Sequence, residues 1–554
     1  MPLSSIVAGA AASSGLYGCA GARSSRSRDH RSEPRPKGAV KLNACVQLRA
    51  VASLLTRDLT APFGRGSVRI VAPLERAGAS PAIMERMATP VTVVILAAGL
   101  GTRMKSHKAK VLHRAGGKTL IEHAVDQALA LTSAERVFVV VGHQAERVRA
   151  AISTPGIGFI DQTEQLGTGH ALLVGREALS QLDGHLVILY GDGPLLRAAT
   201  VRRLIETMEA SEAAGALLSA DMADPTGYGR VIRCSSDRVT AIVEQKVASP
   251  EQLEIREANM GIYCYRADLF WRHAGEMRPE NPAHEYYLTD MVEILNRGGH
   301  SVTAMKIDDP RECLGINDRI ELAEADRLLR ERKLRELMLA GVTIEKPETV
   351  TIDDRVEIGI DTVVEPFALI LGATTIGENC RIGASSVIED SILGDDVVIG
   401  PLTVVTASRI DRGAQAGPFS RLRPGNHVAE GAHVGNFVEL KKTRLGAGAK
   451  ANHLAYLGDS EIGAKANIGA GTITCNYDGV HKHPTRIGSG AFVGSNSTLV
   501  APLEIGDGAY LAAGSVITEP VPADALGVGR ARQVNKEDWA RKRRARSAAP
   551  PAGK

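Results

Sequence analysis

Aromatic residues and long apolar runs are both scarce in this 554-residue chain. Aromatic side chains make up 4% of it, and each aliphatic stretch is interrupted by Gly, Asp or Arg well before the ~20 residues that a membrane-spanning helix requires. The formal net charge is only +3, so charge gives no reason to expect binding to nucleic acid or to a membrane. We therefore expect a soluble protein that binds neither.

Paired cysteines are also missing. The 7 cysteines are scattered and odd in number, and they form neither a CxxC motif nor a Cys/His ligand spacing. The composition thus gives no sign of a disulfide framework, and it favours a reduced, cytoplasmic protein.

Glycine, in contrast, is abundant at 57 residues, and much of it belongs to a six-residue repeat. A period of six fits neither an amphipathic helix nor an alternating strand, but it fits a triangular coil in which three hexapeptides make one turn. The pattern resembles the left-handed parallel β-helix of the hexapeptide-repeat acyltransferases, and we assign it to residues 342–530. The regular aliphatic positions are Ile487, Val493, Leu499, Ile505, Leu511 and Ile517, with a less regular continuation at Ile468, Ile462, Val434, Val428, Ile382 and Ile376.

The length predicts two or three domains. Residues 89–318 alternate strand-like and helix-like segments, beginning with VTVVILAAG at Val91. This predicts a doubly wound, Rossmann-like α/β domain with a parallel sheet, whose ligands bind at the carboxyl ends of the strands. Residues 319–341 are expected to form a linker helix that ends at Gly341. Its apolar stripe consists of Ile320, Leu322, Ala325, Leu329 and Leu337. Residues 531–554 are expected to form a basic, flexible tail.

Residues 1–88 are rich in Ala, Ser, Gly and Arg and show no periodicity. Three interpretations remain open: a targeting peptide, a disordered tail, or translation from an upstream start codon that is not used naturally. Met84 and Met87 directly precede the first strand. Composition alone supports targeting only weakly, so we favour a disordered or non-native extension.

A glycine-rich turn, LAAGLGTRM, follows the first strand from Leu96 to Met104. Its glycines are too closely spaced for a dinucleotide-binding fingerprint. The backbone amides of such a turn and the guanidinium of Arg103 can contact phosphate oxygens. Lys110 supplies a second cation to neutralise the charge of a leaving pyrophosphate, so the segment predicts a nucleoside triphosphate site.

This turn and later segments resemble the sugar-phosphate nucleotidylyltransferase family. The matching segments follow in the family's order: QLGTGHA from Gln165, YGD from Tyr190, GYGR from Gly227, Val243–Glu244 and Gly315–Asn317. With the hexapeptide repeats added, the chain is similar to the bifunctional enzymes of UDP-N-acetylglucosamine synthesis. These transfer acetyl from acetyl-CoA to glucosamine-1-phosphate, and then uridylyl from UTP to N-acetylglucosamine-1-phosphate, for bacterial envelope precursors.

The resemblance implies roles for individual residues of the first domain. Lys110 and Arg103 would be catalytic, and Asp192 and Asn317 would bind Mg²⁺, which prefers hard oxygen ligands. UTP and the UDP-sugar would contact Leu96, Ala97, Ala98, Gly99, Lys110, Gln162, Gly167, Thr168, Tyr190, Gly191, Asp192, Gly229, Glu244, Asn259 and Asn317. Ala109, Gly193 and Met260 depart from the family pattern. Gly193 loosens the loop beside a metal ligand, so activity or metal affinity can be reduced although no ligand is lost.

Polar segments interrupt the repeat between Arg421 and Gly479 and predict a second site, for acyl transfer. An attacking amine needs a base, and histidine suits that role near neutral pH. By the same resemblance His453 would be this base, while Glu439 is a weaker candidate to orient it. Cys475 is expected to be packed, because direct transfer from CoA needs no acyl-enzyme. The sugar phosphate would contact Arg423, Lys441, Tyr456 and Asn467, and acetyl-CoA would contact Ala470, Asn476, Tyr477, Ser495, Ala513 and Arg530.

Members of this family are trimers, so the resemblance implies a homotrimer with a cleft between neighbouring prisms. Two other functions remain open. One is a nucleotidylyltransferase of other sugar specificity with a structural β-helix, and the other is a non-catalytic regulatory or assembly subunit. The joint presence of Lys110, Asp192, Asn317 and His453 favours the bifunctional enzyme.

Overall fold

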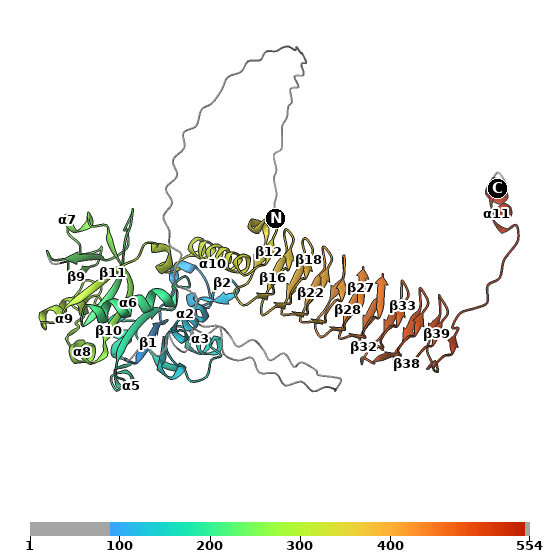
Figure 1. Cartoon of the computed structure of the whole chain (residues 1–554), viewed down its shortest axis with the longest axis horizontal. Coiled ribbons are helices and arrows are strands. Elements are labelled where there is room, and N and C mark those ends of the chain that lie inside the picture. The colour runs from blue at the N-terminus through green and yellow to red at the C-terminus, as the bar shows by residue number, and fades with distance from the viewer. Residues whose placement is uncertain (1–88, 236, 549–554) are drawn as a thin grey trace, which may run out of the picture. The chain divides into compact units, whose positions relative to one another are not determined.

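The computed structural model describes residues 89–235 and 237–548. The extension at residues 1–88 and the end of the basic tail lie outside the described residues. The described chain begins with an α/β domain built on one mixed sheet, followed by helix α10 and a β-helix (Figure 1). The strand order along the first sheet is β11-β7-β10-β6-β1-β4-β5. The bounds of these strands are β1 Val91–Leu96, β4 Val137–Val141, β5 Gly158–Asp161, β6 His185–Tyr190, β7 Gly215–Asp221, β10 Glu257–Arg266 and β11 Val302–Lys306.

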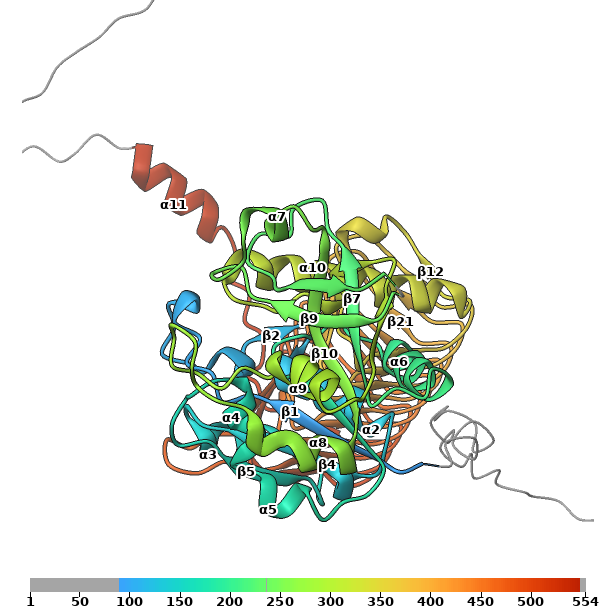
Figure 2. The ribbon, with the colours of Figure 1, turned by 90° about the vertical axis from the view of Figure 1, so that its left-hand side faces the viewer.

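Helices cover both faces of this sheet (Figure 2). Val93 and Ile95 of β1 pack into a core with α2 (Leu120–Leu129), α3 (Ala145–Ala151) and α6 (Ala198–Ala210). Val94 belongs to the opposite core, with α4 (Thr168–Leu173), α5 (Arg176–Leu179), α8 (Ala267–His273) and α9 (Asp290–Arg297). The alternation follows from the two-residue period of a strand that is buried on both faces, and it confirms the expected doubly wound fold.

One strand departs from the expected parallel arrangement. The pairs β1–β4, β1–β6, β4–β5 and β7–β11 are parallel, but β10 runs antiparallel to both β6 and β7. Before β10 the chain forms an antiparallel hairpin, β8 (Arg230–Arg233) and β9 (Val239–Val243), that lies off the main strand path. An entirely parallel sheet was therefore the wrong expectation at β10, because a hairpin, and not a single crossover helix, separates β7 from β10.

Helix α10 (Arg319–Leu339) follows the α/β domain. Its N-cap is Asp318, whose carboxylate accepts hydrogen bonds from the amides of Ile320 and Glu321 at 2.8 and 2.9 Å. Past its end, Gly341 adopts a φ of +99°, a conformation that glycine allows at a helix C-terminus. The apolar stripe expected from the sequence is buried at Ala325, Leu329 and Leu337, but Ile320 is 81% exposed, so the stripe begins later than the pattern indicated.

Residues beyond α10 wind into a left-handed parallel β-helix. Consecutive strands enter three sheets in turn: β12 (Thr343–Ile344), β13 (Thr351–Ile352) and β14 (Glu357–Ile358) each begin one sheet, and β15 (Val363–Val364) returns to the first. Three hexapeptides per turn are thus confirmed. All six regular aliphatic positions from Ile487 to Ile517 are at most 5% exposed, so they form the core of the prism.

Two segments differ from the regular coils, one within the β-helix and one after it. Residues 476–484 leave the coil between β34 (Ile473–Cys475) and β35 (Thr485–Ile487), and a backbone bridge joins Tyr477 to Lys482. Within the basic tail, Trp539–Ala548 form helix α11, which the sequence pattern did not indicate although Ala and Arg favour helix. Across the part of the chain that the structure describes, none of the helices has the length and apolar character that crossing a bilayer demands.

Candidate active sites

A cavity of 660 Å³ opens at the carboxyl ends of β1 and β6, where a doubly wound sheet places its ligands. Twelve of the residues predicted for the first site line it: Leu96, Ala97, Ala98, Gly99, Lys110, Gln162, Gly167, Thr168, Tyr190, Asp192, Glu244 and Asn259. Asn317 and Arg103 do not line the cavity itself, but both reach it through contacts with Lys110 or with each other. The structure therefore gathers residues from segments more than two hundred positions apart in the chain.

One end of the cavity combines two cations with two oxygen-bearing side chains. The Lys110 ammonium forms an ion pair with Asp192 and lies 3.4 Å from Asn317 Oδ1. Arg103 Nη2 donates to the same amide oxygen at 2.8 Å. The loop after β6 and the loop before α10 are joined because the Ile316 amide donates to the Asp192 carbonyl at 2.9 Å. A carboxylate and an amide oxygen beside two cations can hold a divalent metal and phosphate groups together.

A second region of the cavity is built around Gln162, which is 4% exposed at the end of β5. Its Nε2 donates to the Gly167 carbonyl at 3.1 Å and lies 3.2 Å from His170 Nδ1. Gly167 has a φ of +104°, and a Cβ there would lie 2.6 Å from the Tyr286 carbonyl oxygen. Only glycine fits this position, so the GTG segment is required to bring Thr168 and the start of α4 to the cavity.

A third region contains Asn259 and Glu244. Asn259 Nδ2 donates to the Tyr263 hydroxyl at 2.7 Å, and its Oδ1 accepts from the Gly261 amide at 3.1 Å. Burial raises the pKa of Glu244, and a hydrogen bond with Thr289 opposes this only in part. Gly229 does not line the cavity but contacts this region, because its carbonyl accepts a hydrogen bond from the Asn259 amide at 2.8 Å. Such buried polar groups can recognise a hydroxylated ligand.

Sequence reasoning missed Tyr287 and Thr289, which also line the cavity. Both precede α9 in a segment that contains no glycine-rich or charged motif. Their proximity results from the return of the chain after α8, so no local signal indicated them.

The three departures from the family pattern are accommodated without loss of the oxygen ligands. The Ala109 amide donates to Gln144 Oε1 at 3.2 Å, a bond that proline cannot make. Met260 is 6% exposed and packs in the core of the domain. Gly193 has only the Tyr190 carbonyl oxygen near its missing Cβ, at 3.8 Å, so the position has room for a side chain and is not a packing requirement.

In the β-helix, His453 occupies the end of β30 (Lys450–His453), in register with Asn436 at the end of β27 (His433–Asn436). Its Nδ1 lies 2.8 Å from Asn436 Oδ1. Because that oxygen can only accept, the proton sits on Nδ1 and the Nε2 lone pair is free to act as a base. Glu439, the weaker candidate to orient the base, contacts Arg423 at 3.1 Å, and the side chain that contacts His453 Nδ1 is that of Asn436.

The coil stacking brings His453 close to three of the residues predicted for acetyl-CoA. Backbone hydrogen bonds at one corner link successive coils: Leu454 N to Asn436 O, Gly471 N to Leu454 O, Asn496 N to Ala470 O, and Gly514 N to Ser495 O. The residues that precede these four amides form one column along the prism, and Asn436, whose carbonyl accepts from Leu454, extends it by one coil. The column thus consists of Asn436, His453, Ala470, Ser495 and Ala513. We name it the catalytic column. Arg530 lies beside Gly514 at its lower end.

The residues predicted for the sugar phosphate are divided between two sheets. Arg423, Lys441 and Tyr456 lie on or directly after β25 (Arg421–Leu422), β28 (Glu439–Lys441) and β31 (Tyr456–Gly458), which are neighbours in one sheet. Asn467 begins β33 (Asn467–Ile468) in the sheet that carries His453. Asn476, at the start of the 476–484 segment, is bonded to Asp459, while Tyr477 is 59% exposed.

Lys482 was missed by sequence reasoning because it lies in the 476–484 segment, away from the repeat. Its ammonium contacts that of Lys441, which lowers the pKa of Lys482. Two lysines in contact, with Asp459 at 3.8 Å from Lys441 Nζ, provide the excess positive charge that a phosphate group would neutralise.

Two family models match separate parts of the chain. Residues 93–249 match the MobA-like NTP transferase domain, and residues 355–390, 373–407 and 484–519 match the bacterial transferase hexapeptide (six repeats). A solved CMP:2-keto-3-deoxy-manno-octonic acid synthetase complexed with CTP is 19% identical, with a TM-score of 0.33, over 44% of this chain and 100% of that chain.

Two curated relatives match nearly their whole length. The bifunctional protein GlmU of Solibacter usitatus is 68% identical over 461 residues, which cover 83% of this chain and 99% of that protein. The bifunctional protein GlmU of Koribacter versatilis is 51% identical over 456 residues, which cover 82% of this chain and 97% of that protein. The chain therefore belongs to the GlmU family of bifunctional acetyltransferases and uridylyltransferases.

Proposed function

We propose that the α/β domain, residues 89–318, transfers uridylyl from UTP to N-acetylglucosamine-1-phosphate, and that the β-helix, residues 342–530, acetylates glucosamine-1-phosphate from acetyl-CoA. The observation that carries the first assignment is the contact of Lys110 with both Asp192 and Asn317 at one end of the cavity. The family implies sugar phosphate, UTP and acetyl-CoA as substrates and a divalent metal requirement. The two alternatives, a structural β-helix and a non-catalytic subunit, are not favoured.

In the uridylyl transfer, a phosphate oxygen of N-acetylglucosamine-1-phosphate forms a bond to the α-phosphorus of UTP. The bond from that phosphorus to the bridging oxygen breaks, and pyrophosphate leaves with the electron pair. Arg103 and Lys110 stabilise the negative charge. The backbone of Leu96–Gly99 holds the nucleotide, Gln162 and Thr168 read uracil, and Glu244 and Asn259 orient the sugar, so that positioning supplies most of the acceleration.

We assign the divalent metal as Mg²⁺, held by Asp192 and Asn317. The donor chemistry fits, because both groups present hard oxygens to the same ammonium of Lys110. Among the described residues no cluster of three His, Cys, Asp or Glu is suited to a metal. Phosphate oxygens of the substrate and water would supply the remaining ligands. When bound, the ion neutralises phosphate charge and orients the triphosphate.

In the acetyl transfer, His453 Nε2 accepts a proton from the amine of glucosamine-1-phosphate as the nitrogen attacks the thioester carbonyl. The carbon–sulfur bond then breaks, and CoA leaves as a thiolate that takes up a proton. Asn436 holds the imidazole in the required tautomer. The sugar phosphate is bound by Arg423, Lys441, Tyr456 and Asn467. Acetyl-CoA is bound by Ala470, Asn476, Tyr477, Ser495, Ala513 and Arg530.

We further propose a homotrimer in the cytoplasm. An exposed apolar ridge supports association: Phe367, Leu402, Phe419, Phe437 and Leu454 are each between 46% and 61% exposed. Phe419 stacks on Phe437 with ring centroids 5.2 Å apart. Phe437 and Leu454 directly follow Asn436 and His453 of the catalytic column, so a neighbouring prism that covers the ridge would also close the acetyl-transfer site.

One coupled assay tests these assignments. The full chain is given glucosamine-1-phosphate, acetyl-CoA, UTP and Mg²⁺, and free CoA and pyrophosphate are measured. His453→Ala should abolish CoA release and leave uridylylation of supplied N-acetylglucosamine-1-phosphate intact. His427→Ala is the matched control, because His427 pairs with Asp411 in another sheet and should keep both activities. Loss of both activities in His453→Ala, or of neither, would contradict the two-site assignment.

A further inference from the structure

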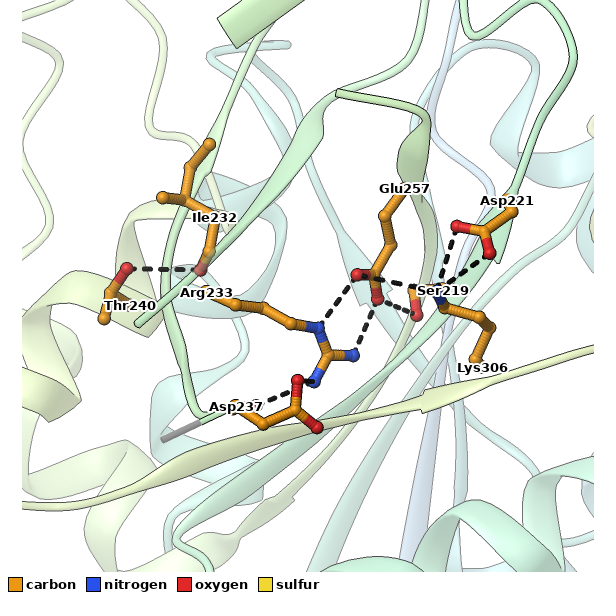
Figure 3. Close-up of polar contacts among 8 residues, drawn as sticks. All are labelled: Ser219, Asp221, Ile232, Arg233, Asp237, Thr240, Glu257 and Lys306. Carbon is orange, nitrogen blue, oxygen red and sulfur yellow. Dashed lines mark hydrogen bonds and ion pairs between the residues drawn. The ribbon is translucent and has the colours of Figure 1, made fainter. Parts of the chain in front are cut away.

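A group of polar side chains that does not touch the cavity joins three elements of the α/β domain (Figure 3). At its centre Arg233 donates to the Glu257 carboxylate through Nε at 2.8 Å and Nη2 at 2.7 Å. Ser219 Oγ on β7 donates to Glu257 Oε1 at 2.6 Å. Arg233 also donates through Nη1 to the Asp237 carbonyl at 2.8 Å. Arg233 ends β8, and Glu257 begins β10.

Both residues are two to four positions in the sequence from residues that are proposed to bind the sugar. Glu257 lies two positions before Asn259 on β10, and Arg233 lies four positions after Gly229, which directly precedes β8. β8 and β10 share one ladder pair, Arg230 with Ala258, and the Asn259 amide bonds to the Gly229 carbonyl next to it. β9 leads directly into Glu244. The hairpin that supplies Gly229 and Glu244 is thus attached to β10 by few backbone bonds.

Asn259 itself sits where the β10–β7 pairing shifts register. Between Asn259 and Tyr263 the strand bulges, and Gly261 takes a φ of +78°. Residues 260–262 therefore lack regular ladder pairs with β7, and the pairs that anchor β10 before this bulge are Glu257 with Asp221, Ala258 with Ala220 and Asn259 with Ser219.

The Arg233–Glu257 contact adds a strong side-chain attachment between β8 and β10 to these few backbone bonds. The side chains are 19% and 11% exposed, and the two parallel bonds have the geometry of a bidentate, charge-assisted pair. Burial disfavours the charge on Glu257, yet the bonds from Arg233 and Ser219 outweigh it and hold the pKa of Glu257 below its usual value. Removal of Arg233 would leave the largely buried Glu257 carboxylate with only the Ser219 hydroxyl and the Lys306 ammonium, 3.9 Å away. The hairpin would then keep its core packing and its bonds to Asn296 but lose its strongest side-chain link to β10.

We infer that the Arg233–Glu257 pair positions the sugar-recognition wall, by holding the β8–β9 hairpin on β10 so that Gly229 and Glu244 stay opposite Asn259. Neither residue touches substrate, so both are positioning residues. This inference rests on the proposed role of Gly229, Glu244 and Asn259 in binding the sugar.

The test compares Arg233→Met with the wild type as full chains. We expect the KM for N-acetylglucosamine-1-phosphate to rise by roughly tenfold, the scale of one charge-assisted hydrogen bond. The KM for UTP and the rate of CoA release should stay unchanged, because the uracil region and the β-helix are not attached to this pair. Arg233→Glu combined with Glu257→Arg should recover most of the sugar affinity, since it restores the pair in reverse.

Asp221→Asn serves as the matched control. Asp221 forms an ion pair with Lys306 at 2.9 Å beside the same strands, but the two side chains are 61% and 45% exposed, and an exposed pair contributes little. Its KM values should match those of the wild type. The inference is overturned if Arg233→Met lowers only the thermal midpoint and keeps the sugar KM within about twofold, or raises the KM of UTP equally.

Hydrogen exchange separates this inference from the proposed function. In Arg233→Met the amide of Asn259 should exchange faster, because its acceptor, the Gly229 carbonyl, is held by the hairpin. Unchanged exchange there would refute the positioning role even for an active enzyme. Failure of the wild type to release pyrophosphate would refute the proposed function and leave the exchange result to decide the attachment.

Discussion

Replacement of Asp290 should change the stability of the protein, and the structure predicts both the sign and the size of that change. It is the first residue of α9 and is partly buried, directly after Thr289 at the cavity wall. Burial, followed by the nearby carboxylates of Glu293 and Glu244, raises the pKa of Asp290 from 3.8 to about 6. We consider the replacement Asp290→Asn, which keeps the shape and removes the charge.

The raised pKa of Asp290 sets an upper limit on the change in the free energy of unfolding. Because one pKa unit equals about 1.4 kcal/mol, a rise from 3.8 to about 6 corresponds to at most about 3 kcal/mol. Solvent reaches the partly buried carboxylate and screens it, so we reduce this to about 1 kcal/mol. A carboxyl group whose pKa is higher in the folded state binds its proton more tightly there. Its charge therefore opposes folding above the folded pKa, and the effect disappears as the pH falls from about 6 to about 4.

Asp290→Asn should consequently be more stable than the wild type by about 1 kcal/mol at pH 8, with no difference at pH 4. The two tryptophans of the chain make the measurement specific. Trp271 is buried on α8, which packs on α9, while Trp539 is 55% exposed. Thermal unfolding followed by tryptophan fluorescence thus reports on the α/β domain, and the midpoint should rise by about 2–4 °C at pH 8. Equal midpoints at pH 8, or destabilisation at both pH values, would refute the reasoning.

Three other outcomes concern the β-helix. Asn436→Ala should lower the rate of CoA release by roughly fivefold, the effect of one neutral hydrogen bond that orients His453, with pyrophosphate release unchanged; an equal loss in both assays would contradict this. Lys482→Met should raise the KM for glucosamine-1-phosphate by roughly tenfold through the lost charge beside Lys441, while the KM for acetyl-CoA serves as the internal control. Phe437→Glu should convert the trimer to smaller species in light scattering and abolish CoA release, because a charge cannot be buried unpaired in an apolar interface; a stable trimer in this variant would exclude the ridge as the interface.

The candidate site residues that could be predicted are those that belong to local sequence motifs. The GxGTRM and YGD segments place Gly99 and Asp192 after strands, the GTG segment places Gly167 at the start of α4, and the structure gathers twelve of the predicted residues around one cavity. Tyr287, Thr289 and Lys482 could not be found in this way, since they reach their sites through the return of the chain after α8 and through the 476–484 segment.

By itself the sequence determined the architecture of the β-helix, because a six-residue period with small corner residues has one compact solution, and burial of every regular aliphatic position follows from it. It also determined the doubly wound character of the first domain through alternating apolar strands and helices. Only the tertiary structure decided that β10 runs antiparallel, that Asn436 and not Glu439 contacts His453, and that Arg233 pairs with Glu257. Each of these depends on contacts between distant segments, for which local periodicity carries no information.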